Sequence, residues 1–217
     1  MFQDIKAAIF DMDGTLIDSM WVWEKVSIEY LKSRNISIPK NLNESLAHLT
    51  FEESAKYFKN KFNLKDDIYT IMGEWNHMAY NEYNSNVKLK KGALDFLMAL
   101  KNKGIKLGLA TSNCDMLLKI ALKSNGIFDI FDCITTSDEV NKSKEFPDVY
   151  LLCARRLNVD PKHCIVFEDI LPAVRGAKSA GMKVVGVHDV YAQNQQKEIM
   201  QNADFYILEY NELITAV

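Results

Sequence analysis

The stretch that decides the fold of this chain is Ile9-Phe10-Asp11-Met12-Asp13-Gly14-Thr15-Leu16-Ile17-Asp18-Ser19. A short apolar strand, predicted over residues 5–10, ends here in two carboxylates, Asp11 and Asp13, followed by a glycine. Where a strand gives way to a turn, both side chains can converge on one small volume, and the strand ends of open α/β sheets are where ligands bind. Two neighbouring carboxylates repel each other unless a cation or a shared proton lies between them. The stretch therefore indicates a metal site or acid–base chemistry at the end of a strand.

The segment Asp11-Met12-Asp13-Gly14-Thr15-Leu16-Ile17-Asp18 resembles the first motif of the haloacid dehalogenase (HAD) superfamily of aspartate-dependent phosphohydrolases. Three later segments resemble the other motifs of that superfamily, in order: Gly108-Leu109-Ala110-Thr111-Ser112-Asn113, Ser143-Lys144-Glu145-Phe146-Pro147-Asp148 and Ile165-Val166-Phe167-Glu168-Asp169. Many relatives carry a proline where this chain has Glu145. Four ordered motifs at predicted strand ends, spread over nearly the whole chain, argue against coincidence.

The pattern of apolar and polar residues differs between two parts of the chain. From about residue 89 onward, apolar segments at 105–110, 133–135, 164–167, 183–187 and 205–208 alternate with amphipathic helices, a pattern typical of a parallel sheet. Residues 19–87 indicate helices instead, and Thr50 with Glu53 has the spacing of a capping box. An insert of roughly 70 residues is far longer than an ordinary loop. An insertion just after the first motif resembles the cap of the C1-capped HAD branch, which contains β-phosphoglucomutases and small-sugar phosphatases.

We therefore predict an α/β protein in two parts. The first is a Rossmann-like catalytic core with a parallel sheet, made of residues 1–17 and 88–217. The second is an inserted, all-helical cap domain, residues 18–87.

Composition bounds the possible functions. The chain has 217 residues, of which 48% are hydrophobic and 25% charged, enough for one ordinary core and a small second domain. The net charge of −3 and the lack of a dense basic run favour neither a nucleic-acid nor a membrane partner. We expect no signal peptide and no transmembrane segment. The cysteines form no C-x-x-C pair, so we expect reduced, mostly buried thiols in a cytoplasmic protein. The sequence does not indicate an oligomeric state.

The resemblance implies roles for the acidic residues. Asp11 is the expected nucleophile, and its attack on phosphorus gives an aspartyl-phosphate that splits one hard displacement into two easier ones. Asp13 is expected to protonate the leaving oxygen and later to deprotonate the attacking water. Carboxylates and a phosphate dianion repel, so a cation is required, and oxygen ligands indicate Mg²⁺. The expected ligands are Asp11, the backbone carbonyl of Asp13, and Asp169, with Glu168 contributing directly or through water.

Positive and polar groups are needed around the transferred phosphoryl group. The Thr111 hydroxyl and the backbone amides of Ser112 and Asn113 are expected to bind phosphate at a strand-to-helix turn, although a simple helix cap would look the same in sequence. Lys144 is expected to hold both the nucleophile and the phosphate. The competing interpretation is a solvated surface run that includes Lys142.

Substrate choice depends on the insert. Trp21 and Trp23 begin its first helix beside the expected site, where they either close over the substrate or serve only for packing. Trp23 and Phe51 stand where β-phosphoglucomutases carry a histidine and an arginine, so the second phosphate of a sugar bisphosphate would lack a cation. We therefore predict a Mg²⁺-dependent phosphatase of small phosphorylated metabolites, sugar phosphates above all. The alternatives are a β-phosphoglucomutase-like phosphosugar mutase and a non-catalytic binding protein on the same scaffold.

Overall fold

The structure, a computed structural model, describes residues 1–46 and 49–216. Its internal contacts divide the chain into two compact units, Met1–Ser19 with Val87–Val217 and Met20–Asn86. None of the helices among the described residues combines the length and apolar character that crossing a membrane would require.

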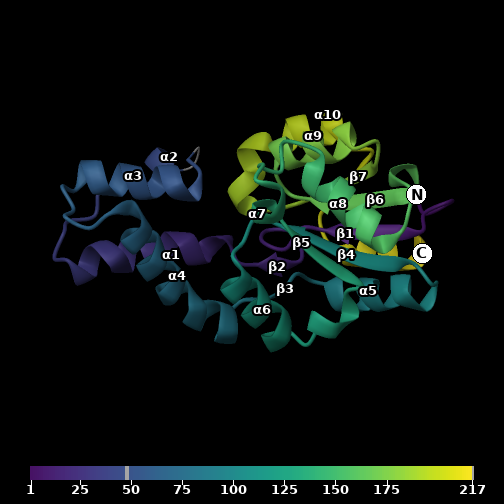
Figure 1. Cartoon of the computed structure of the whole chain (residues 1–217), viewed down its shortest axis with the longest axis horizontal. Coiled ribbons are helices and arrows are strands. Elements are labelled where there is room, and N and C mark those ends of the chain that lie inside the picture. Colours follow the sequence, from purple (N-terminus) through teal and green to yellow (C-terminus); the bar gives the residue numbers. More distant parts are fainter. Residues whose placement is uncertain (47–48, 217) are drawn as a thin grey trace. The chain divides into compact units, whose positions relative to one another are not determined.

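A parallel sheet forms the centre of the larger unit (Figure 1). It has six strands in the order β5-β4-β1-β6-β7-β8. The strands are β1 Ala7–Phe10, β4 Lys106–Thr111, β5 Cys133–Thr136, β6 Cys164–Glu168, β7 Lys183–Val187 and β8 Phe205–Ile207. The predicted α/β class with a Rossmann-like sheet is confirmed. The first strand begins at Ala7 and not at residue 5, because Ile5 belongs to a turn in which its backbone N–H donates to the carbonyl oxygen of Phe2.

Helices cover both faces of this sheet, which is why its strands read as nearly continuous apolar runs. The helices of the unit are α5 Ala93–Asn102, α6 Asp115–Ser124, α7 Ser137–Val140, α8 Asp148–Leu157, α9 Leu171–Ser179 and α10 Gln196–Asn202, with 3-10 turns η1 Phe128–Ile130, η2 Pro161–His163, η3 Val190–Gln195 and η4 Tyr210–Ala216. On one face, α8, α9 and α10 bury alternate strand residues such as Ile9 and Val166. On the other face, Phe10 stacks on Phe167 with ring centroids 4.5 Å apart, and Phe96 of α5 packs edge-on against both.

The strand order places the functional motifs side by side. After β1 the chain builds β4 and β5 on one side of it, and then β6, β7 and β8 on the other. Phe10 of β1 is in register with both Leu109 of β4 and Phe167 of β6. The carboxyl ends of these three adjacent strands therefore meet at the point where the order reverses, and open α/β sheets bind ligands at such points.

The smaller unit contains only helices among its described residues: α1 Met20–Ser33, α2 Leu42–Leu46, α3 Phe51–Lys61 and α4 Ile68–Ser85. The predicted capping box begins α3, because the Thr50 hydroxyl accepts from the Glu53 backbone N–H at 3.2 Å and the Glu53 carboxylate accepts from the Thr50 N–H at 2.8 Å. The interior is aromatic. Phe58 and Tyr30 both pack edge-on against Trp75, with centroids 4.8 Å and 5.7 Å away.

Two short strands, β2 Ile17–Asp18 and β3 Lys88–Leu89, form a separate antiparallel ribbon within the larger unit. Ile17 pairs with Leu89, and Asp18 pairs with Lys88. The ribbon thus joins the segment that leaves the larger unit to the segment that returns to it.

Candidate active site

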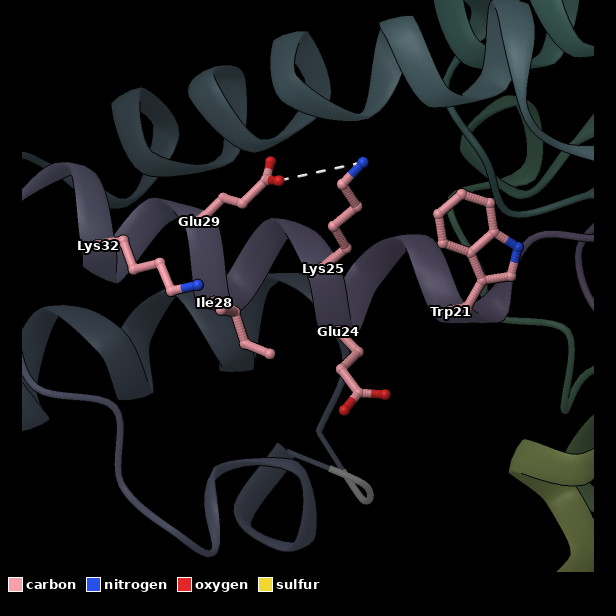
Figure 2. Close-up of a pocket in the computed structure, with 6 residues that line it drawn as sticks. All are labelled: Trp21, Glu24, Lys25, Ile28, Glu29 and Lys32. Atoms are coloured by element: carbon pink, nitrogen blue, oxygen red, sulfur yellow. Dashed lines mark ion pairs between the residues drawn. The ribbon is translucent and has the colours of Figure 1, made fainter.

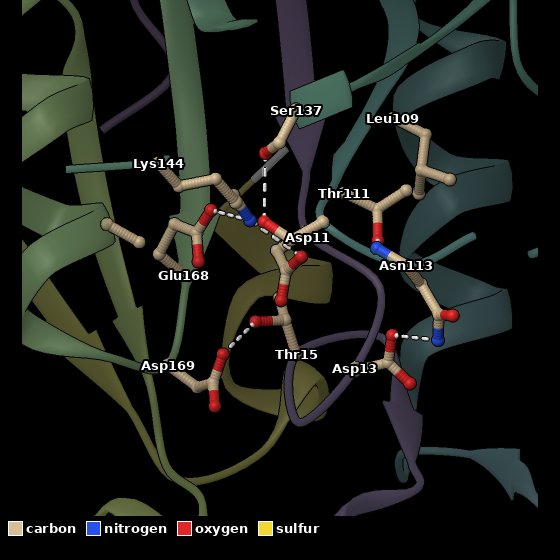
Figure 3. Close-up of polar contacts among 12 residues, drawn as sticks. Asp11, Asp13, Thr15, Leu109, Thr111, Asn113, Ser137, Lys144, Glu168 and Asp169 are labelled. Carbon is tan, nitrogen blue, oxygen red and sulfur yellow. Dashed lines mark hydrogen bonds and ion pairs between the residues drawn. The ribbon is translucent and has the colours of Figure 1, made fainter. Parts of the chain in front are cut away.

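Asp11 lies directly after β1, where its backbone N–H continues the sheet by donating to the carbonyl of Phe167 at 3.0 Å. Lys144 Nζ lies 2.6 Å from Asp11 Oδ1 and also forms an ion pair with Glu168 (Figure 3). All three side chains are buried, so the lysine is held between two carboxylates away from bulk water. The structure therefore brings together the first, third and fourth sequence motifs at one point.

The two candidate lysines of the third motif have different environments. The side chain of Lys142 is 49% exposed and pairs with Asp148 at 2.8 Å, whereas that of Lys144 is 8% exposed. The backbone of Lys144 reaches this position because α9 carries a glycine beneath it. A Cβ atom on Gly176 would lie 2.0 Å from the Lys144 carbonyl oxygen. Only a glycine lets the loop approach the helix this closely.

Two hydroxyl groups orient the acidic pair that ends β6, and sequence reasoning assigned neither of them a role. The Tyr150 hydroxyl donates to Glu168 Oε1 at 2.7 Å, and the Thr15 hydroxyl donates to Asp169 Oδ1 at 2.8 Å. Thr15 belongs to the first motif and could have been considered on that ground. Tyr150 carries no signal in the sequence, because its role depends on how α8 packs over the sheet.

Two carboxylates, Asp11 and Glu168, contact the Lys144 ammonium, and a third, Asp169, lies beside them. Burial by itself would lower the pKa of Lys144, but the negative charges of Asp11 and Glu168 outweigh it and raise that pKa above its usual value. Burial raises the pKa of Glu168, and the charges of Asp11 and Asp169 add to this effect while Lys144 opposes it. Burial and the charge of Asp11 also raise the pKa of Asp169, to about 8. These shifts favour protons on the two acids in the metal-free protein, and a bound cation would take the place of those protons.

Asp13 lies in a different hydrogen-bonded group. Its Oδ1 atom accepts from the Ser19 hydroxyl at 2.7 Å, and its Oδ2 atom accepts from the Asn113 side-chain amide at 2.9 Å. The Asn113 backbone N–H donates to the Thr111 hydroxyl at 3.0 Å, so the end of β4 is directly connected to the first motif. The carboxylate of Asp13 is thus held in one orientation by donors from two segments.

Ser112 forms a further contact that sequence reasoning missed. Its hydroxyl lies 2.8 Å from the hydroxyl of Ser137, the first residue of α7. The segment after β4 therefore contacts the start of α7. This contact places Ser137 beside the predicted phosphate-binding segment.

The comparison with known families identifies the family of the chain. The family model for the haloacid dehalogenase-like hydrolases matches residues 8–187. The chain belongs to this family. The family resemblance read from the four motifs is thereby confirmed.

Several HAD proteins are similar to the chain over nearly its whole length. Hexitol phosphatase B of Escherichia coli (strain K12) is 27% identical over a stretch that covers 97% of this chain and 95% of that protein. Beta-phosphoglucomutase of Bacillus subtilis (strain 168) is 30% identical over a stretch that covers 96% of this chain and 92% of that protein. The crystal structure of CbbY from Rhodobacter sphaeroides in complex with phosphate has the same fold, with a TM-score of 0.82, 24% identity and 96% of each chain covered.

HAD phosphatases generally use a metal ion, and the residues present here fit one. Asp11, Glu168 and Asp169 each offer a carboxylate oxygen, and these oxygens lie within 4.8 Å of one another. Glu168 Oε2 is buried and has no hydrogen-bond partner within the protein. Buried polar atoms without partners are rare in proteins, and an unpaired carboxylate oxygen beside two others is suited to a hard cation.

The two tryptophans for which the sequence left open a role in substrate choice or in packing belong to the smaller unit of this HAD protein and have different surroundings. Trp23 packs edge-on against Phe51, with ring centroids 5.1 Å apart, and lies 6.3 Å from the ring of Tyr83. Trp21 lies at one end of a pocket of about 300 Å³ along α1 (Figure 2). The pocket is lined by Trp21, Glu24, Lys25, Ile28, Glu29 and Lys32.

Proposed function

We propose that this chain is a Mg²⁺-dependent phosphatase that hydrolyses small phosphorylated metabolites, sugar phosphates above all, through an aspartyl-phosphate on Asp11. The observation that carries the proposal is the buried arrangement of Asp11, Lys144 and Glu168, with Asp169 beside them. It unites a carboxylate nucleophile, a fixed positive charge and a group of oxygen ligands in one place. The likeness to hexitol phosphatase B supports the substrate class.

In the first half of the proposed reaction, Asp11 attacks phosphorus while Lys144 offsets the charge of the phosphoryl oxygens. Because the Lys144 ammonium is buried and held by two carboxylates, it does not have to reorganise as charge develops. The Thr111 hydroxyl and the backbone amides of Ser112 and Asn113 are proposed to bind the remaining phosphoryl oxygens. Binding would require the Asn113 N–H to exchange its bond to Thr111 for one to phosphate.

Asp13 is proposed as the general acid and base. Its two oxygens are oriented by Ser19 and Asn113, so a proton on this carboxyl group would have a defined direction. The protonated group would donate to the oxygen of the leaving alcohol. The resulting carboxylate would then take a proton from the water that hydrolyses the aspartyl-phosphate and releases Asp11.

We propose Mg²⁺ as the metal ion, held by Asp11, Asp169 and the backbone carbonyl of Asp13, with Glu168 as a direct or water-mediated ligand. An all-oxygen donor set favours a hard divalent cation. When bound, Mg²⁺ would supply the positive charge that allows a carboxylate and a phosphate to approach each other.

We further propose that residues 1–17 and 88–217 form the catalytic core and residues 18–87 the cap, in which Trp21 and Trp23 influence substrate choice. The net charge of −3 supports dissolved phosphate esters as substrates rather than nucleic acids or membrane lipids. The free thiols of the described chain support a cytoplasmic site of action.

The test of the proposed function is a panel of phosphate monoesters assayed for release of inorganic phosphate in the presence of Mg²⁺. Asp11→Asn keeps the shape of the side chain and removes the attacking charge, so turnover should fall by at least about 10³-fold. Asp129→Asn, a change at an exposed aspartate outside the cluster, is the matched control and should leave turnover unchanged. An Asp11→Asn variant with a tenth of the original activity would rule out the aspartyl-phosphate mechanism.

A phosphosugar mutase is the second candidate, favoured by the likeness to the Bacillus β-phosphoglucomutase. A mutase must bind two phosphates in turn, yet Trp23 and Phe51 pack against each other and cannot pair with a phosphate. β-Glucose 1-phosphate with catalytic glucose 1,6-bisphosphate should therefore yield free phosphate and little glucose 6-phosphate. Isomerisation with kcat/KM above about 10⁴ M⁻¹s⁻¹ would establish the mutase instead.

A further inference from the structure

A pair of thiols lies away from the acidic cluster, between strand β5 and helix α8. Cys133 is the first residue of β5, and Cys153 lies in the middle of α8. Their Sγ atoms are 3.2 Å apart, and the Cys133 thiol also lies 3.7 Å from the carbonyl oxygen of Cys153. The proposed phosphatase reaction uses neither residue.

A glycine in the neighbouring strand makes room for this pair. Gly108 of β4 is directly opposite Cys133 in the sheet. A Cβ atom on Gly108 would lie 2.4 Å from the Sγ atom of Cys153 and 3.5 Å from that of Cys133. Any larger residue at this position would push the Cys153 sulfur atom out of its present place beside Cys133.

The two thiols differ in access to solvent and in acidity. Cys133 is partly exposed, whereas Cys153 is completely buried. The hydrogen bond from Cys153 lowers the pKa of the Cys133 thiol, and the positive charge of Arg156 adds to this effect against the opposing influence of burial. The same hydrogen bond, together with burial, raises the pKa of Cys153. Cys133 is therefore the thiol that reaches the reactive thiolate form, and Cys153 is the nearby partner that remains protonated.

We propose that Cys133 and Cys153 form an oxidative modification site at which a hydroperoxide produces a reversible intramolecular disulfide. The Cys133 thiolate attacks one peroxide oxygen, the O–O bond breaks, and Cys133 becomes a sulfenic acid while the other oxygen leaves and takes up a proton. The Cys153 sulfur then attacks the sulfenic sulfur, the S–O bond breaks, and water leaves with the thiol proton. Two thiols lose two electrons in total, and the hydroperoxide accepts them.

The geometry requires only a small adjustment. A disulfide bond is about 2.05 Å long, so the sulfur atoms must approach each other by roughly 1 Å. Cys133 can supply this movement because β5 is an edge strand of the sheet and Cys133 is its first residue. The resulting disulfide would link the edge strand β5 covalently to α8.

The experiment treats the reduced full-length protein with hydrogen peroxide, blocks the remaining thiols by alkylation, and maps the tryptic peptides by mass spectrometry. Lys142 and Lys144 separate the two cysteines in the sequence, so a disulfide appears as two linked peptides. We expect the loss of two thiols, the linked pair as the main product, and full reversal by dithiothreitol. Cys164→Ser is the matched control, because Cys164 lies outside the pair, and this variant should form the same disulfide.

Two further measurements test the order of the steps. In Cys153→Ser the sulfenic acid on Cys133 should persist long enough to be trapped by dimedone. In the reduced wild-type protein Cys133 should be alkylated at least about tenfold faster than Cys164, whose pKa is raised to about 12 by burial. The alkylation rates do not depend on how the Cys153 variant folds.

Several results would overturn the proposal. Oxidation that begins at Cys114 or Cys164, a disulfide that forms between molecules, or equal alkylation rates for Cys133 and Cys164 would each exclude a reactive pair. The thiol measurements do not require phosphatase turnover, so they stand or fall independently of the proposed function.

Discussion

Asp169 offers the sharpest test of the electrostatic reasoning, because its carboxyl group is buried beside another acid. Burial and the charge of Asp11 raise its pKa from 3.8 to about 8, although the hydrogen bond from Thr15 opposes the shift. The folded protein therefore binds a proton at Asp169 over a pH range in which the unfolded chain has lost it. Through this group, the free energy of unfolding of the metal-free protein falls as the pH rises from about 4 to about 8, and it is constant outside that window.

The size of the effect follows from the same pKa shift. At pH 7 the pH is about three units above the pKa of the unfolded chain, and each unit corresponds to about 1.36 kcal/mol. Through Asp169 alone, the free energy of unfolding of the metal-free protein should thus be roughly 4 kcal/mol lower at pH 7 than in acidic solution. Asp169→Asn removes the titrating group but retains an oxygen that can accept from Thr15. We expect the variant to be about 2–4 kcal/mol more stable than the wild type near pH 8 in the presence of a chelator.

The measurement is urea unfolding with excess chelator at several values between about pH 5 and about pH 8, followed by circular dichroism. The wild type should lose stability across this range, and Asp169→Asn should show a flatter dependence. Asp129→Asn controls for the loss of one negative charge at an exposed position. Parallel pH profiles for the wild type and Asp169→Asn would refute the assignment. Addition of Mg²⁺ should reverse the order of stability, because the ion replaces the proton in the wild type only.

Three other outcomes can be measured directly. Tyr150→Phe removes the hydroxyl that donates to Glu168 at 2.7 Å, so the free energy of unfolding should fall by roughly 1–3 kcal/mol in urea titrations; an unchanged midpoint would contradict a significant role for that bond. Phe58→Ala removes a fully buried side chain from the smaller unit and should lower the free energy of unfolding in urea by about 3–5 kcal/mol. Phe62→Ala, at a half-buried position, should lower it clearly less, and equal losses for the two variants would contradict this reasoning. Chelation should abolish phosphate release, and Mg²⁺ should restore it whereas Ca²⁺ should not, because its looser geometry misplaces Asp11; full turnover in excess chelator would exclude a metal-dependent reaction.

The sequence was sufficient to predict the sheet because its strands are short apolar runs between well-marked helices. Each motif then follows a strand, and the parallel arrangement brings the strand ends together without further information. The choice between Lys142 and Lys144 could not be made in the same way. It depends on the close approach of the loop to Gly176, which no local pattern in the loop reveals.

The contacts that sequence reasoning missed are those made between distant segments. Thr15 and Asp169 are 154 residues apart in the chain, and their hydrogen bond exists only because β1 and β6 are neighbours in the sheet. Tyr150 reaches Glu168 through the packing of α8 over the sheet. The contact between Cys133 and Cys153 was missed for the same reason, because the two residues are on separate elements and form no C-x-x-C motif.

The ribbon of β2 and β3 has a consequence for how such a protein can change over time. Asp18 and Lys88, the two ends of the long insertion, are paired across antiparallel strands, so a hairpin turn of a few residues could join them directly. The polypeptide between them can therefore be shortened, exchanged or enlarged without breaking any strand of the main sheet. The nucleophile, the lysine and the acidic pair all lie outside that replaceable segment. Mutation can thus vary the segment Met20–Asn86 while selection preserves the phosphoryl-transfer machinery of the larger unit, which includes Ser19 as a partner of Asp13.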